Sequence, residues 1–95
     1  MYSSTKITGK KAKKLVEKGA ILLDARSPVA FRDGTLPGAV NISTRQISML
    51  GKYPKTTKLV FFGDDQQSVS TMLNYAFNMG FTDAFTFGNI DEWDK

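Results

Sequence analysis

The 95-residue chain contains no cysteine and no histidine. Without cysteine it has no disulfide, no thiolate nucleophile, no persulfide and no thiolate metal ligand. Without histidine it also lacks the side chain that most often serves as a general base near neutral pH and as a metal ligand. Whatever the chain does, it does without these two side chains.

Long hydrophobic runs are absent as well. No apolar segment approaches the ~18–20 residues that a membrane-spanning helix needs, and no apolar stretch of the signal-peptide kind follows Met1. We therefore expect a soluble, cytoplasmic protein, with the periplasm as the alternative if a signal peptide has been removed. With 41% hydrophobic and 12% aromatic residues, the chain has the length and composition of one domain.

Acidic residues are scarce in the first two thirds of the chain. Residues 1–62 carry 12 basic and 3 acidic groups, for +9, whereas residues 63–95 carry 1 basic and 6 acidic groups, for −5. Five lysines fall within nine residues: Lys10, Lys11, Lys13, Lys14 and Lys18. Such a cluster attracts acidic partners, nucleic acid or anionic membranes, although a solvated helix face is the simpler interpretation. No interleaved aromatic residues or arginines favour nucleic acid.

Hydrophobic patterning predicts an α/β domain with a largely parallel sheet. Short, continuous apolar runs predict strands over 20–23, 39–42, 59–62 and 84–87. Helical spacing predicts helices over 10–18, 29–33 and 69–77, and a brief helix after residue 44. Strands that alternate with helices are typical of parallel sheets.

Local signals predict where these elements begin and end. Thr8 and Ser27 stand where N-caps are expected, and Thr44 is the predicted cap of the brief helix. Gly80 is expected to end the longest helix. We also expect Trp93 to pack its ring against the core from a terminal helical turn.

Two polar segments follow predicted strands, at the edge where parallel sheets bind ligands. One contains Asp24 and Arg26. The other comprises Gly63, Asp64, Asp65, Gln66, Gln67 and Ser68. The second leads into a helix, whose N-terminal amides favour anions, but its two aspartates repel them.

Residues 21–28, Phe31 and residues 34–42 resemble the signature of rhodanese-like domains, approximately Leu-Asp-Val-Arg-x-x-x-Glu-Phe-x-x-Gly-His-Ile-Pro-Gly-Ala-x-Asn. Residues 58–62, 69–80 and 88–93 resemble the family's central strand, its following helix and its Gly-Gly-Ile-x-x-Trp ending. The resemblance implies a single rhodanese-like domain over 1–95. Its sheet is expected to be mostly parallel, with about five short strands and helices on both faces.

Rhodaneses are sulfurtransferases in which a cysteine after the central strand carries sulfur as a persulfide, within a loop that typically reads Cys-x-x-Gly-x-Arg. On that pattern the cysteine falls on Gly63, the glycine on Gln66 and the arginine on Ser68. The histidine of the signature falls on Thr35, a change that we interpret as structural. The resemblance therefore implies the fold but not the activity, and we do not predict an enzyme.

Replacements for the missing nucleophile are not favoured by the sequence. Ser68 and Ser70 have no histidine base, and an alkoxide does not carry sulfane sulfur. Asp64 and Asp65 have no third ligand at a recognisable spacing, so we expect no metal and no cofactor. Asp24 and Arg26 are interpreted as a structural ion pair or as a hydrogen-bond bracket for the neighbouring loops.

The leading hypothesis is thus a non-catalytic, monomeric domain that binds a protein partner or regulates it. The degenerate loop over 63–68 and the lysine cluster are its two candidate surfaces. The alternative is a sulfurtransferase accessory, in which the loop binds a small sulfur-containing anion or a partner's persulfide. Association with nucleic acid or a membrane surface through the lysines is the third, less favoured hypothesis.

Overall fold

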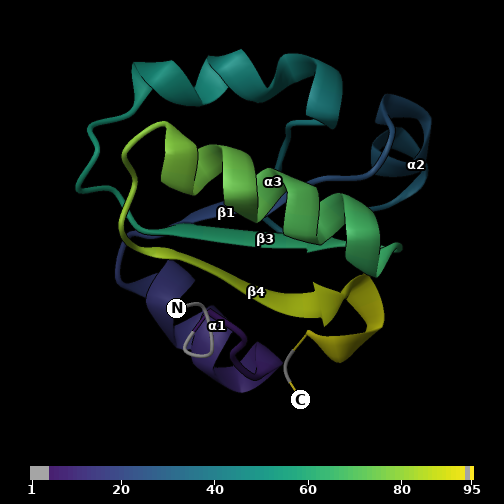
Figure 1. Cartoon of the computed structure of the whole chain (residues 1–95). Coiled ribbons are helices and arrows are strands. Elements are labelled where there is room, and N and C mark those ends of the chain that lie inside the picture. The colour runs from purple at the N-terminus through teal and green to yellow at the C-terminus, as the bar shows by residue number, and fades with distance from the viewer. Residues whose placement is uncertain (1–4, 94) are drawn as a thin grey trace.

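The computed structural model describes residues 5–93 and residue 95, which form a three-layered α/β domain (Figure 1). Four parallel strands lie in the order β2-β1-β3-β4. Their bounds are β1 Ile21–Asp24, β2 Val40–Asn41, β3 Leu59–Gly63 and β4 Ala84–Asn89. The helices are α1 Gly9–Glu17, α2 Pro28–Asp33 and α3 Gln66–Asn78, and the 3₁₀ segments are η1 Thr44–Lys52 and η2 Ile90–Glu92. The predicted α/β class with a parallel sheet is confirmed.

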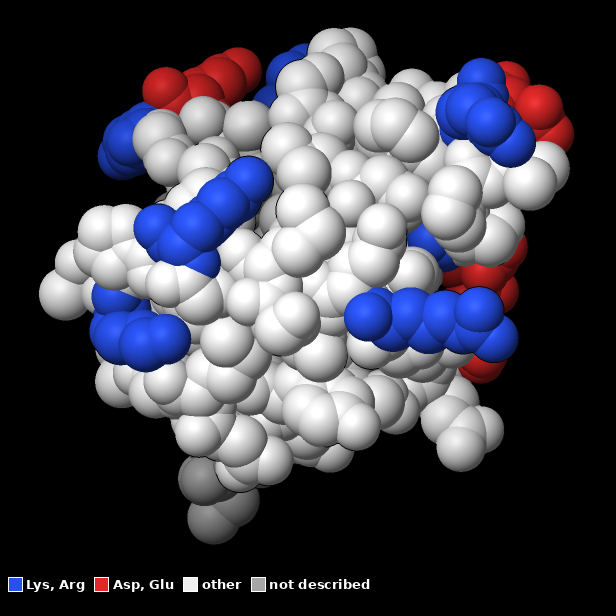
Figure 2. Space-filling model, turned by 90° about the horizontal axis from the view of Figure 1, so that it is seen from above, with Lys and Arg blue, Asp and Glu red and all other residues white. Residues whose placement is uncertain are grey.

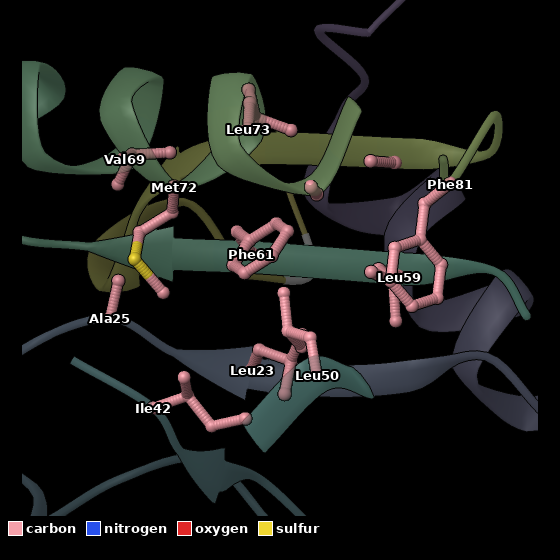
Figure 3. Close-up of a cluster of buried hydrophobic side chains, with 12 residues drawn as sticks. Leu23, Ala25, Ile42, Leu50, Leu59, Phe61, Val69, Met72, Leu73 and Phe81 are labelled. Carbon is pink, nitrogen blue, oxygen red and sulfur yellow. The ribbon is translucent and has the colours of Figure 1, made fainter. Parts of the chain in front are cut away.

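The central strand β3 is buried on both faces, which explains its unbroken apolar sequence. Because side chains alternate along a strand, Leu59 and Phe61 join the cluster beneath α3 and η1 (Figure 3). Val60 and Phe62 join the opposite cluster, which also contains Ala12 of α1. One sheet thus has a separate core on each face.

The expected number of about five strands is wrong for the described residues, which contain four. A short segment runs parallel to β4 along its outer edge, where Thr86 N donates to Thr5 O and Ile7 N donates to Thr86 O. It forms one isolated bridge, because α1 begins at Gly9 and turns the chain away from the edge before a ladder can form.

Several predicted boundaries agree with the structure. Thr8 and Ser27 accept from backbone amides as N-caps, and the ring centroid of Trp93 lies 5.4 Å from that of Phe87. The predicted cap at Thr44 is wrong, because Ser43 precedes η1. The Gln46 side chain accepts from Ser43 N at 3.3 Å. A glutamine three residues after Ser43 therefore marked the N-cap in the sequence, and Thr44 did not.

Gly88 sets how the last strand meets the edge of the sheet. Its φ of 98° is a left-handed value that favours glycine. The register between β3 and β4 shifts at this point, so that Gly88 pairs with Phe62 and Asn89 pairs with Gly63. The bulge therefore brings the ends of both strands to the same edge.

Candidate functional site

Asp24, the last residue of β1, is fully buried at the carboxyl edge of the sheet. Its carboxylate accepts from the Arg26 guanidinium, with Nε 3.0 Å from Oδ1 and Nη2 2.9 Å from Oδ2. Arg26 N also donates to Oδ1 at 2.9 Å, and Thr35 Oγ1 donates to Oδ2 at 2.8 Å. Donors from Arg26 and Thr35 thus occupy both carboxylate oxygens, so Asp24 anchors these two residues.

Arg26 extends this anchor to the segment after α2. Its Nη2 donates to Gly34 O, 2.6 Å away, and its side chain is only 11% exposed. The hydrogen bond to Asp24 raises the pKa of Arg26, against a smaller effect of burial that lowers it. From β2, Asn41 Nδ2 donates to Asp24 O and Arg26 O at 3.0 and 2.9 Å. Three segments are therefore joined at one point.

Gly63 has no free space beside it. It ends β3, is buried, and pairs with Asn89. A Cβ placed on Gly63 would lie 2.9 Å from Val69 Cγ2, closer than side chains normally approach. Val69 belongs to the core on the α3 face, so this methyl group cannot simply turn into solvent.

The predicted loop over 63–68 is only partly a loop. Asp64 and Asp65 alone connect β3 to α3, and Gln66, Gln67 and Ser68 form the first turn of α3. Asp65 is the N-cap: its Oδ1 accepts from Gln67 N at 3.1 Å, and its Oδ2 accepts from Ser68 Oγ at 2.9 Å. The sequence placed the start of the helix at residue 69, because apolar spacing begins there and the polar first turn carries no periodic signal.

The start of α3 separates two clefts and contributes different residues to each. A cleft of about 580 Å³ is lined by Lys6–Gly9, Phe87–Asn89, Asp64, Gln66, Glu92 and Lys95. A second, of about 470 Å³, is lined by Ala25, Ser27, Pro28, Ser43–Gln46 and Ser68. The structure therefore does not bring residues 63–68 together around one ligand.

Arg45 is a candidate binding residue that the sequence did not indicate. It lies in the first turn of η1 and lines the smaller cleft together with Ser27, Ser43 and Ser68. An exposed cation among three hydroxyls supplies a positive charge to the cleft, although the loop arginine of the signature is absent. The sequence could have indicated Arg45, because this residue follows closely after β2, at the sheet edge where ligands bind.

The lysine cluster lies elsewhere, on α1, which covers the opposite face of the sheet from α3 (Figure 1). Lys10, Lys11, Lys14 and Lys18 are exposed, and Lys13 is partly buried. Lys10, Lys13, Lys14 and Glu17 line a shallow depression. The two predicted surfaces are thus separate sites.

Across residues 5–93 and 95, no group of three or more carboxylates lies close enough together to hold a metal ion. Nor does any helix there have the length and apolar character required to cross a membrane.

The parallel sheet, covered by helices on both faces and ending in a polar edge with two clefts, defines an α/β domain of the kind that binds ligands beyond the ends of its strands. A family model for the rhodanese-like domain matches residues 8–95. The chain therefore belongs to the rhodanese-like domain family, as the sequence signature implied.

Relatives and solved structures agree with this assignment. The chain is 27% identical over 98 residues to thiosulfate sulfurtransferase GlpE of Pseudomonas syringae pv. syringae (strain B728a), covering 98% of this chain and 90% of that protein. The Alr3790 protein from Anabaena sp. has a TM-score of 0.81 at 20% identity, covering 90% of this chain and 81% of that one. The single-domain sulfurtransferase RDL2 of Saccharomyces cerevisiae has a TM-score of 0.79 at 23% identity, covering 94% and 87%. These structures share the fold.

Proposed function

We propose that this chain is a rhodanese-like domain without sulfurtransferase activity, which serves as a protein-binding or regulatory module. The observation that carries the proposal is Gly63, at the position of the family's nucleophile. It has no side chain, and a Cβ added there would lie 2.9 Å from Val69 Cγ2. Asp64 and Asp65 add negative charge where an anionic sulfur donor would approach, and Ser68 Oγ is held by Asp65.

Incubation of the purified chain with thiosulfate and cyanide is expected to yield no thiocyanate above the blank. No cysteine is present to accept the sulfane sulfur as a persulfide. Colorimetric detection of the iron–thiocyanate complex measures the product, and an active rhodanese assayed in parallel serves as the positive control. Turnover comparable to that control would overturn the proposal.

The surface of α1 is the better supported docking face for a protein partner. Lys10 and Lys11 lie in the first helical turn, where the positive end of the helix dipole disfavours cations, and this turn carries no acidic residue. Glu17, the helix's acidic residue, lies at the opposite end. Lysines in the first turn lower the stability of the helix, so a contribution to folding does not explain why they are there. An acidic partner would gain from both the lysines and the dipole.

The double substitution Lys10→Glu and Lys11→Glu is expected to raise stability while weakening the binding of an acidic partner. Each change replaces a cation by an anion at the helix N-terminus, worth about 0.3–1 kcal/mol. A short polyglutamate peptide is the probe, and fluorescence anisotropy is expected to show binding about tenfold weaker for the variant. Thermal unfolding measures the stability gain.

The matched control for this experiment is the double substitution Lys52→Glu and Lys55→Glu, which changes the net charge by the same amount at two exposed lysines in and after η1, away from α1. Peptide binding by this variant is expected to match that of the unaltered chain. Equal binding by all three proteins would show that α1 is only a solvated face. Tighter binding of duplex DNA or anionic vesicles than of the peptide would contradict a protein partner.

A second candidate function, a sulfurtransferase accessory, is favoured by the cleft at Arg45. This exposed cation and the hydroxyls of Ser27, Ser43 and Ser68 suit a small oxyanion such as thiosulfate. Titration with thiosulfate, followed by amide chemical shifts, tests it. Shifts confined to this cleft and abolished by Arg45→Gln would support an accessory role, and an unshifted spectrum would exclude it.

A further inference from the structure

The outer surface of α3 lacks charge altogether. Its sequence, QQSVSTMLNYAFN, has no acidic or basic residue, although 23% of the whole chain is charged. Surface helices ordinarily carry charged residues on the face away from the core. Figure 2 shows this side of the molecule, formed by η1 and α3, with its lysines and arginines spaced apart and uncharged surface between them. Tyr75 is 46% exposed on this layer.

Four polar residues of α3 form a stripe along the helix, three of them exposed and Thr71 partly buried; Gln66, Ser70 and Tyr75 are exposed outside it. Gln67, Thr71, Asn74 and Asn78 follow one another at intervals of four, three and four residues, on the side away from the buried Val69, Met72, Leu73 and Ala76. The contact seam between two paired helices has the same spacing but is usually apolar, whereas this stripe is polar. Every side chain in the stripe both donates and accepts hydrogen bonds.

Such a stripe is complementary to itself when two copies of the helix run antiparallel. Gln67 then faces Asn78 of the second copy, and Thr71 faces Asn74. An isologous contact requires this self-complementarity, because the same patch is used by both subunits. A partly buried Thr71, whose Oγ1 donates to Gln67 O at 2.9 Å, still has lone pairs to accept from an amide.

Acidic residues predominate just before α3, and basic residues predominate near its last turn, although each end also has a residue of the opposite charge. Asp64 and Asp65 precede its first residue, with Arg45 as the cation of that end. At the other end, Lys55 lies against Gly80, and its Nζ is 4.6 Å from the ring centroid of Phe81. Lys52 is also exposed, at the end of η1. Antiparallel pairing therefore brings the aspartates of each copy to the lysines of the other.

We propose that the outer face of α3 is a self-association surface, on which a second copy of this chain packs with its own α3 antiparallel about a two-fold axis. At high concentration we thus expect a dimer, whereas the sequence alone predicted a monomer. Since the stripe is polar and about 17 Å long, the dimer is weak, with a Kd of about 10–100 µM. The proposal is independent of whether the domain transfers sulfur.

Sedimentation velocity from about 1 µM to 1 mM, a range that brackets this Kd, is expected to show the monomer converting to a dimer. Asn74→Lys places two lysines close to the two-fold axis and is expected to weaken association at least tenfold. Asn74 is exposed and lysine is a good helix former, so circular dichroism should report an unchanged fold. Glu17→Gln is the control, because it changes the net charge by the same amount on the other side of the sheet.

Disulfide trapping tests the orientation, and a chain without cysteine suits it because each introduced thiol is unique. Thr71→Cys and Asn74→Cys variants are mixed in equal amounts and oxidised. Antiparallel packing predicts that the mixed dimer exceeds either homodimer, as measured by intact mass. A sedimentation profile that stays monomeric, association unaffected by Asn74→Lys, or an excess of either homodimer would each overturn the proposal.

Discussion

Replacing Asp24 by alanine is expected to cost about 3–5 kcal/mol of the free energy of unfolding. The substitution leaves the Arg26 guanidinium nearly buried without its carboxylate, and it removes the acceptor of Thr35 Oγ1. It also loosens the attachment of Gly34 O, which Arg26 holds. Urea unfolding followed by the fluorescence of Trp93 measures the loss. A loss below about 1 kcal/mol would show that the ion pair does not hold the edge together.

Two further variants separate the charge effect from simple loss of contacts. Arg26→Met on the Asp24→Ala background removes the unpaired cation, so part of the lost stability is expected to return. Asp33→Ala is the matched control, because this carboxylate is exposed on α2. Its effect is expected to stay within about 0.5 kcal/mol. A double variant less stable than Asp24→Ala would contradict the burial penalty as the cause.

The sequence was sufficient to predict the four observed strands, because most of them are continuous apolar runs bounded by glycine, proline and caps. Leu59–Phe62 illustrates this. The strand is buried on both faces, so its sequence is apolar throughout and does not alternate between apolar and polar residues as a surface strand does. The isolated bridge at Lys6 was not predictable, because a polar segment pairs there at one point only. Helix starts were missed for a similar reason: a polar first turn, as in Gln66–Ser68, has no apolar period.

The site was harder to predict than the fold, since it depends on contacts between residues distant in sequence. The motif placed Asp24 and Arg26 together, two residues apart, and the structure shows them paired. Nothing local indicates that Val69 blocks Gly63, that Arg45 shares a cleft with Ser68, or that residues 64 and 68 line different clefts. Each of these facts arises from how α3 and η1 pack on the sheet.

Rebuilding the family's loop in this chain is expected to require space as well as a thiol. Gly63→Cys alone places a Cβ 2.9 Å from Val69 Cγ2. Overpacking of this kind costs about 1–3 kcal/mol. The introduced thiol also lies near Asp64 and Asp65, which disfavour the thiolate. We therefore expect Gly63→Cys to unfold at lower urea concentration than the unaltered chain, and to give no measurable thiocyanate.

Adding Val69→Ala, Gln66→Gly and Ser68→Arg supplies the missing space, backbone freedom and cation. Arginine at the helix N-terminus favours the thiolate, so the thiol pKa is expected to fall relative to Gly63→Cys with Val69→Ala. A donor that stabilises developing negative charge is worth about 10²–10³-fold in rate, which sets the gain expected from Ser68→Arg. Thiol titration and thiocyanate release measure the two effects. If neither changes, the start of α3 has lost more than its functional side chains, because its helical first turn no longer presents the backbone that sulfur transfer requires.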